Sequence, residues 1–218
     1  MSTLNLPPIE SLPSLPDSSI TAALDLLFEP SADLHALVLP SIKSSSFTSY
    51  DALISQAGAK LLDLANAANL AALDAHNDNK DLPEERQKLH GILGAHPRLG
   101  AAKPATVATA RQGKGEGEEE EEELSEQSKA EQKQLRGGDP GEAEKLRKLN
   151  DEYEAKFPGL RYVVWVNGRG RPEIMADMRR RIDSGDIRGE ERAAIQAMCD
   201  IARDRAGKLL KAAEGRQE

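Results

Sequence analysis

The stretch "SYDALISQAGAKLLDLANAANLAALDAH", residues 49–76, is the longest run of the sequence with the periodicity of a helix. Its apolar residues recur every three or four positions, which places Leu53, Ala57, Leu61 and Leu64 on one stripe. A stripe of this kind packs against the apolar faces of neighbouring helices. The stretch therefore predicts a helical bundle and its longest element.

The composition favours the same fold class. The chain has 218 residues, enough for one sizeable core and rather short for two full domains. Aromatic residues make up only 3%, while Ala and Leu are abundant, a balance typical of packed helices. We expect an all-α, single-domain bundle of about seven or eight helices with one extended crossing segment.

Helical periodicity continues on both sides of residues 49–76. Caps, proline stops and apolar stripes predict further helices over 17–29, 31–39, 81–96, 124–135, 139–157, 171–182 and 189–213. The pattern breaks at Tyr162 to Val166, which is predicted to be extended and buried and to end at the turn residues Asn167 and Gly168.

Two segments differ in composition from this helical domain, which we expect to span residues 17–213. Residues 1–16 contain four prolines and predict a flexible arm, and residues 214–218 form a short tail. Residues 101–123 are of low complexity and predict a disordered acidic insertion. Glu116 and Glu118 to Glu123 carry seven of the negative charges, so the net charge of −8 leaves the rest of the chain nearly neutral.

These features exclude several classes of partner. A nearly neutral body predicts no binding to nucleic acid or to anionic membranes. No apolar run approaches the ~20 residues that span a bilayer, and the N-terminus lacks the features of a secretory signal. Cys199 is the only cysteine, so no internal disulfide forms and a reducing compartment fits. We expect an intracellular protein, cytoplasmic by default.

One histidine stands at a helix stop. In "GILGAHPRLGAAK", residues 91–103, His96 directly precedes Pro97, and a residue in that position is disfavoured in a helix. The helix is therefore expected to end at His96. Such a histidine is either a packing residue or a catalytic group at the mouth of a cavity, and the stretch alone leaves both open.

Two further groups are polar residues on helix faces expected to point inward. Ser128, Glu131 and Gln132 have the spacing i, i+3 and i+4 and share one face. They either bind a ligand or are satisfied by polar neighbours. Arg205 lies within the apolar stripe of the last helix, where it needs a carboxylate from the protein or from a ligand. By contrast, Arg179 to Arg181 are expected to be solvated.

No metal site is predicted. His90 and His96 are six residues apart and fall on different helix faces, and no Glu-His ligand pair stands nearby. The candidates that remain are one histidine, one glutamate with flanking Ser and Gln, and one inward arginine. Together they supply an acid/base pair and an anion clamp that need neither a metal nor an organic cofactor.

The sequence resembles the 2-oxo-4-hydroxy-4-carboxy-5-ureidoimidazoline (OHCU) decarboxylases, which complete the conversion of urate to (S)-allantoin. The resemblance runs from about Ala22 to Leu210 and rests on "AHPRLG", "SKAEQ", "LNDEYEAKF", "VNGRGRPEIMADMRRRI" and "IARDRAGKLL", in the family's order. It implies an all-helical, cofactor-free carboxy-lyase that acts on a small molecule, forms a homodimer and, by its role, is cytoplasmic or peroxisomal.

The resemblance also implies site residues. His96 corresponds to the family's catalytic histidine, Glu131 to its glutamate and Arg205 to the arginine of its last helix. The implied substrate contacts are Pro97, Ser128, Gln132, Tyr162, Val163, Val164, Trp165 and Val166, the last five through backbone groups. In this sequence "FPGLRYV" stands where the family has Phe-Gly-Phe-Pro-Phe.

One alternative of a different class is a non-catalytic helical scaffold that keeps this fold and uses the Glu-rich segment to bind a partner. The joint presence of His96, Glu131 and Arg205 argues for the enzyme, because a degenerate copy is expected to lose at least one of them.

Overall fold

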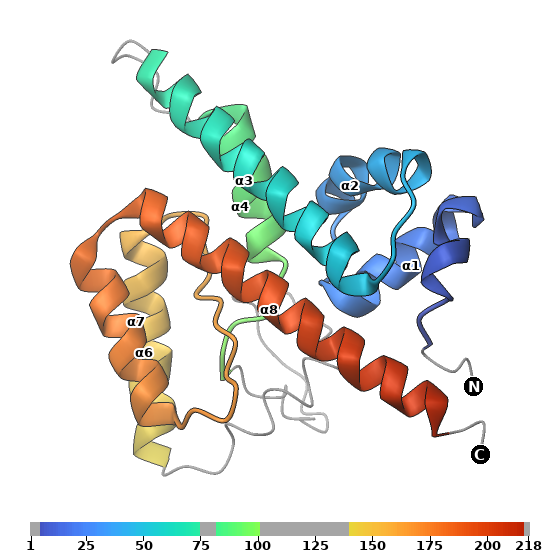
Figure 1. The fold of residues 1–218 in the computed structure, drawn as a ribbon. Helices are drawn as coiled ribbons and strands as arrows, with labels where there is room; N and C mark the ends of the chain where they lie inside the picture. Colours follow the sequence, from blue (N-terminus) through green and yellow to red (C-terminus); the bar gives the residue numbers. More distant parts are fainter. Residues whose placement is uncertain (1–4, 75–81, 101–139, 216–218) are drawn as a thin grey trace, which may run out of the picture.

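The computed structural model describes residues 5–74, 82–100 and 140–215, and in these the chain is all-helical without a strand. Figure 1 shows one compact body. The elements are a 3-10 helix η1 (Ile9–Ser14) and the α-helices α1 (Asp17–Leu27), α2 (Ala32–Ser44), α3 (Tyr50–Asp74), α4 (Glu84–Gly94), α6 (Pro140–Lys156), α7 (Arg171–Ser184) and α8 (Ile187–Glu214). The predicted fold class is confirmed. The predicted helix 124–135 and the acidic insertion lie outside the described residues.

The two longest helices form the centre of the bundle. α8 runs the length of the molecule and packs most extensively on α3 (Figure 1). The predicted stripe on α3 is buried at Leu53, Ala57 and Leu61, whereas Leu64 is half-buried. α4 packs on α3, α1 packs on α8, and α6 pairs with α7 beside the N-terminal half of α8. Residues 49–76 therefore supply one of the two helices on which the others assemble.

α3 and α8 approach closely at Gly58. A Cβ atom built there would lie 2.8 Å from Sγ of Cys199, a distance that real side chains do not adopt. Cys199 is 5% exposed, as expected for a core residue, and burial raises the pKa of its thiol to about 11. The absence of a side chain at position 58 therefore sets how near the two central helices lie.

α2 continues through a predicted stop. The sequence predicts an end before Pro40, but the helix runs to Ser44 with Pro40 inside it. Leu34, Val38 and Ile42 form one stripe that is at most 1% exposed. Burying Ile42 outweighs the backbone hydrogen bond that a proline within a helix removes.

The N-terminal segment is more ordered than the predicted flexible arm. Within residues 1–16, the 3-10 helix η1 covers Ile9–Ser14 and packs on α2. Ile9 and Leu12 are buried, and the hydroxyl of Tyr50 donates a 2.6 Å hydrogen bond to the carbonyl of Pro7. Apolar residues among the prolines fix this segment on the domain.

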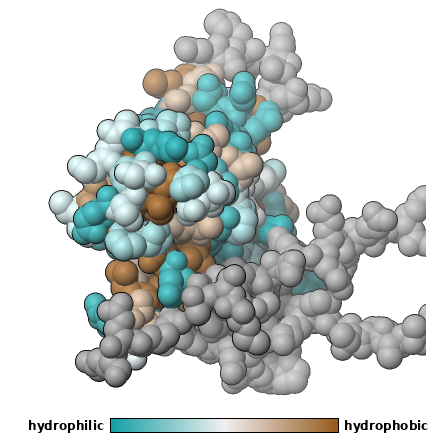
Figure 2. Space-filling model, turned by 90° about the vertical axis from the view of Figure 1, so that its right-hand side faces the viewer, coloured by the Kyte–Doolittle hydropathy of each residue, from teal (hydrophilic) through white to brown (hydrophobic). Residues whose placement is uncertain are grey.

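Figure 2 views the described residues from the side that carries α2 and η1. Figure 2 shows this side as mainly hydrophilic, with the hydrophobic residues in separate small groups. Among the described residues, no helix combines the length and apolar character that crossing a bilayer requires.

Candidate active site

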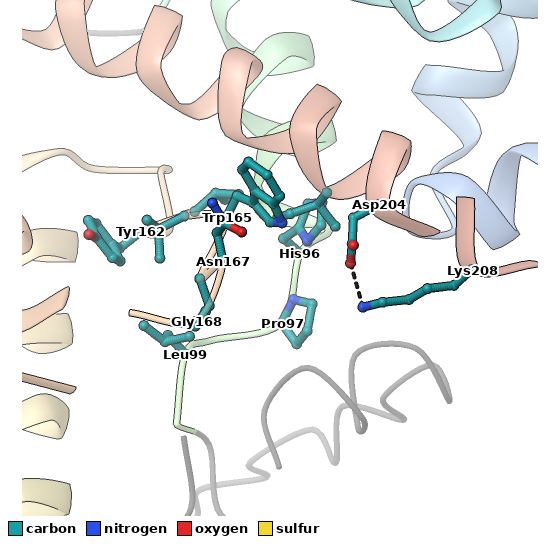
Figure 3. Close-up of a pocket in the computed structure, with 13 residues that line it drawn as sticks. His96, Pro97, Leu99, Tyr162, Trp165, Asn167, Gly168, Asp204 and Lys208 are labelled. Carbon is teal, nitrogen blue, oxygen red and sulfur yellow. Dashed lines mark hydrogen bonds and ion pairs between the residues drawn. The ribbon is translucent and has the colours of Figure 1, made fainter. Parts of the chain in front are cut away.

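A pocket of about 220 Å³ opens between the end of α4, the segment after α6 and the C-terminal half of α8 (Figure 3). Its walls come from three parts of the chain. The described residues that line it are His96, Pro97, Leu99, Tyr162, Val163, Val164, Trp165, Val166, Asn167, Gly168, Ile201, Asp204 and Lys208. Seven residues predicted as site residues, His96, Pro97 and Tyr162 to Val166, thus meet in one pocket.

His96 is held at the pocket by the way α4 ends. The helix stops at Gly94, two residues before the predicted end, and His96 follows the C-cap residue Ala95. Pro97 prevents the helix from continuing. The backbone carbonyl of His96 accepts a 3.3 Å hydrogen bond from the guanidinium of Arg161, which fixes the turn. The backbone of His96 is therefore fixed by the end of α4 before it and by Pro97 and the Arg161 hydrogen bond after it. This fixed backbone places the imidazole at the pocket.

The His96 side chain is buried and incompletely paired. It is 5% exposed, and among the described residues its Nε2 atom has no hydrogen-bond partner. Burial and then the positive charge of Arg205 lower the pKa of the imidazole to about 3. The ring is consequently neutral at pH 7. A buried, neutral nitrogen without a partner in a pocket is able to accept a proton or a hydrogen bond from a ligand.

Arg205 obtains its carboxylate from the protein. The side chain is 1% exposed, and its guanidinium donates to the carboxylate of Glu29 at 2.8 Å and to the carbonyl of Phe28 at 2.6 Å. Phe28 follows the last residue of α1, so Arg205 joins α8 to the end of α1. Arg205 does not line the pocket, but its charge acts on His96. The sequence predicts the need for a carboxylate, and the fold supplies Glu29.

The extended segment forms one wall of the pocket. Residues 160–166 are neither helix nor strand, as predicted for Tyr162 to Val166. Asn167 and Gly168 follow with positive φ angles of 44° and 75°, which confirms the predicted turn. Arg169 donates to the carbonyls of Trp165 and Val166 and closes the turn. The segment therefore presents its backbone beside His96 in one fixed conformation.

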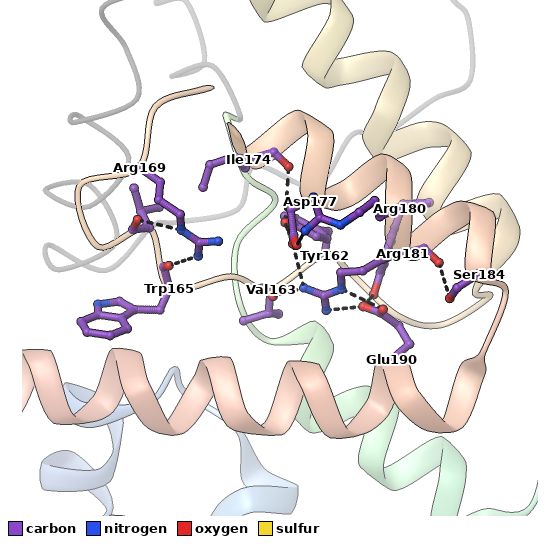
Figure 4. Close-up of polar contacts among 12 residues, drawn as sticks. Tyr162, Val163, Trp165, Arg169, Ile174, Asp177, Arg180, Arg181, Ser184 and Glu190 are labelled. Carbon is purple, nitrogen blue, oxygen red and sulfur yellow. Dashed lines mark hydrogen bonds and ion pairs between the residues drawn. The ribbon is translucent and has the colours of Figure 1, made fainter. Parts of the chain in front are cut away.

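A network of charged and aromatic residues fixes the other end of this segment (Figure 4). Arg181 forms a two-pronged ion pair with Glu190, donates to the carbonyl of Val163 and lies 4.6 Å from the ring centre of Tyr162. The hydroxyl of Tyr153 also donates to Glu190, which is 3% exposed. The network therefore ties α6, α7 and α8 to the segment.

This network corrects one expectation for Arg179 to Arg181. The side chains of Arg179 and Arg180 are 42% and 71% exposed, as expected, but that of Arg181 is only 16% exposed. Arg181 comes from the side of α7 that faces α8, where Glu190 compensates its charge. The spacing of three consecutive arginines does not reveal this, because the partner lies on the next helix.

Two charged residues of the pocket are absent from the predicted set. Asp204 and Lys208 are one turn apart on α8 and form an ion pair at 2.5 Å. Ile201, Asp204 and Lys208 have the spacing i, i+3 and i+7 on α8. This spacing places all three residues on one face of the helix, and all three line the pocket. That spacing is a signal in the sequence, but it is also typical of an ordinary solvated pair.

Ser128, Glu131 and Gln132 lie outside the described residues. Their roles stay predictions. Among the residues that the structure does describe, no group of three or more His, Cys, Asp or Glu side chains is placed to hold a metal ion.

A helical domain with a buried, neutral histidine in a pocket lined in part by an extended segment has the features of an enzyme that moves protons on a small molecule. The family model of OHCU decarboxylase matches residues 13–207, most of the chain, and the protein belongs to this family. Membership supports a role in urate degradation. A search among curated proteins gave no match.

Proposed function

We propose that this protein decarboxylates 2-oxo-4-hydroxy-4-carboxy-5-ureidoimidazoline to (S)-allantoin without a cofactor. The observation that carries the proposal is His96, a buried and neutral histidine whose Nε2 atom has no hydrogen-bond partner among the described residues, in the pocket of a domain that belongs to this family. The part of the pocket that the described residues line has a volume of about 220 Å³.

The reaction itself needs no external electron sink. The bond between the ring carbon and its carboxylate breaks, and the electron pair moves toward the adjoining imine, whose nitrogen takes a proton. The resulting enol is protonated at the carbon that carries the ureido group, and the hydroxyl proton leaves as the ketone forms. The protein must therefore hold the ring, move protons and deliver one of them to a single face.

The described residues suit these tasks. His96 is neutral and takes or returns a proton through Nε2. Tyr162 to Val166 line the pocket, and their backbone N–H groups would donate hydrogen bonds to the ring carbonyl and the ureido carbonyl. Burial and, to a smaller extent, the charge of Arg205 keep His96 neutral, and Arg205 adds a positive potential that attracts an anionic substrate.

The predicted residues outside the described part complete the proposal. Glu131 would share the proton transfers with His96, and Ser128 and Gln132 would fix the ring by hydrogen bonds. Glu131→Gln then lowers kcat more than it raises KM, whereas Ser128→Ala mainly raises KM.

The decisive experiment generates the unstable substrate from urate in situ and follows (S)-allantoin by circular dichroism. We expect the protein to raise both the rate and the enantiomeric excess. If it raises neither, the proposed function is wrong. The non-catalytic scaffold of the same fold is then the better description.

His96→Asn is the matched test of the site. It should lower kcat by about 10²–10⁴, the usual contribution of a general acid or base, and leave the far-ultraviolet spectrum unchanged. His35→Asn is the control, because His35 pairs with Asp25 at 2.6 Å and does not line the pocket. Full activity of His96→Asn would remove this histidine from the mechanism.

Assembly and location are also part of the proposal. We expect a homodimer, which light scattering after size exclusion tests, and a cytoplasmic or peroxisomal location, which microscopy of a fluorescent fusion tests.

A further inference from the structure

The charged pair Asp204–Lys208 occupies the edge of the pocket. The side chain of Asp204 is 29% exposed and that of Lys208 is 61% exposed, and their charged atoms are 2.5 Å apart. Figure 3 shows the Lys208 side chain extending from α8 toward Pro97, with its ammonium end beside the Asp204 carboxylate. The pair therefore presents one positive and one negative group to a ligand that enters beside His96.

No other described residue offers the same charge to the pocket. Lys208 is the only lysine or arginine, and Asp204 the only acid, among the described residues that line it. Arg205, on the same helix, directs its guanidinium to Glu29 and the carbonyl of Phe28. An anionic group bound in the part of the pocket that the structure describes thus meets its direct positive partner at Lys208.

We propose that Lys208 and Asp204 recognise a ligand with a carboxylate next to a ureido N–H. The Lys208 ammonium binds the carboxylate of the ligand, and the Asp204 carboxylate accepts a hydrogen bond from the ureido N–H. When the ligand binds, these two contacts replace part of the ion pair between Lys208 and Asp204. This inference rests on the proposed function for the identity of the substrate. Lys208 lies one residue beyond the range 13–207 that the family model matches.

The chemistry predicts which kinetic constant Lys208 affects. A cation bound to the carboxylate stabilises the substrate, and the attraction weakens as neutral CO₂ forms. The interaction is therefore stronger in the bound substrate than in the transition state. Removing it should raise KM and leave kcat undiminished, the opposite of the effect expected for His96.

The kinetic test compares three variants. Lys208→Met should raise KM about tenfold, as expected for one charge-assisted hydrogen bond at a partly exposed site, and Lys208→Arg should restore most of the loss. Lys211→Met is the matched control, because Lys211 is exposed on the same helix and does not line the pocket. A KM of Lys208→Met within twofold of the wild type would overturn the proposal.

A binding test does not depend on turnover. Trp165 is the only tryptophan of the chain and lines the pocket, so its fluorescence reports occupancy. Allantoate carries ureido groups and a carboxylate, whereas allantoin is neutral. The wild type should bind allantoate about tenfold more tightly than allantoin, Lys208→Met should lose this preference, and Asp204→Asn should weaken the binding of both.

The kinetic test and the binding test together distinguish the proposed decarboxylase function from the proposed recognition by Lys208 and Asp204. If the protein has no decarboxylase activity but prefers allantoate through Lys208, the proposed function fails and the recognition site stands. If the enzyme is active and Lys208→Met binds allantoate as the wild type does, the recognition site is wrong and the function stands. If it is inactive and shows no preference for allantoate, both are wrong.

Discussion

The two buried polar groups beside the extended segment differ in how completely they are paired. Arg181 and Glu190 meet through two contacts, and Tyr153 and the carbonyl of Val163 add further hydrogen bonds. His96 is 5% exposed, close to the 3% of Glu190, yet among the described residues its Nε2 atom has no partner, and its pKa is lowered. Pairing of this kind stabilises a fold, whereas a buried group without a partner costs stability and marks a place where a ligand binds.

The largest expected effect on stability comes from breaking the paired cluster. Arg181→Met leaves Glu190 buried without its cation, and loss of one partner of a buried pair costs about 3–5 kcal/mol. Urea unfolding followed by circular dichroism measures the loss. Arg180→Met is the control, because its side chain is 71% exposed and its ion-pair partner among the described residues is Asp177 of the same helix, a carboxylate that also accepts a hydrogen bond from Tyr162.

A second variant separates charge from packing in this cluster. Arg181→Met combined with Glu190→Gln removes both charges and should recover a large part of the lost stability. If Arg181→Met alone costs less than about 1 kcal/mol, the cluster does not hold the segment as described.

An intermediate effect is expected from the unpaired group, through pH. The pKa of His96 is about 3 in the folded protein, and an unfolded histidine titrates near 6.5. Because the unfolded chain binds a proton that the folded one excludes, this group lowers stability as the pH falls below 6.5. Between pH 7 and pH 5 the loss from His96 is roughly 2 kcal/mol.

The measurement compares the wild type with His96→Asn by urea unfolding at both pH values. Between pH 7 and pH 5, the free energy of unfolding of the variant should fall by about 2 kcal/mol less than that of the wild type. Equal losses in the two proteins would mean that His96 is not held neutral by its surroundings.

The smallest effect tests the turn that ends the extended segment. Gly168 has a φ of +75° and free space around its Cβ position, so Gly168→Ala should cost about 1 kcal/mol through the backbone alone. Gly207 also has free space but lies within α8, where alanine is favoured by up to about 1 kcal/mol. Thermal unfolding should therefore show the same substitution acting with opposite sign at the two positions.

The fold was more predictable from sequence than the pairing of its buried charges. Helical periodicity and proline stops locate most of the described helices, because both are local properties of the chain. The exception, Pro40, falls in a stripe whose burial depends on other helices. Periodicity also places Arg205 inward but does not identify Glu29, which is 176 residues away.

The candidate site was predictable to the extent that its residues are contiguous. His96 with Pro97, and the segment Tyr162 to Val166, are each local features that the bundle brings to one pocket. Asp204 and Lys208 were missed because a charged pair at helical spacing has the same pattern on a solvated surface and at the edge of a pocket.

The close approach of α3 and α8 at Gly58 gives the molecule an internal reporter of opening. Cys199 is the only thiol, it is buried against that glycine, and its pKa of about 11 leaves little thiolate at neutral pH. A thiol reagent therefore reacts with it only when the two central helices separate. The rate at which Cys199 is labelled in the native protein, followed by mass spectrometry with increasing urea, measures the free energy of that separation without an engineered probe.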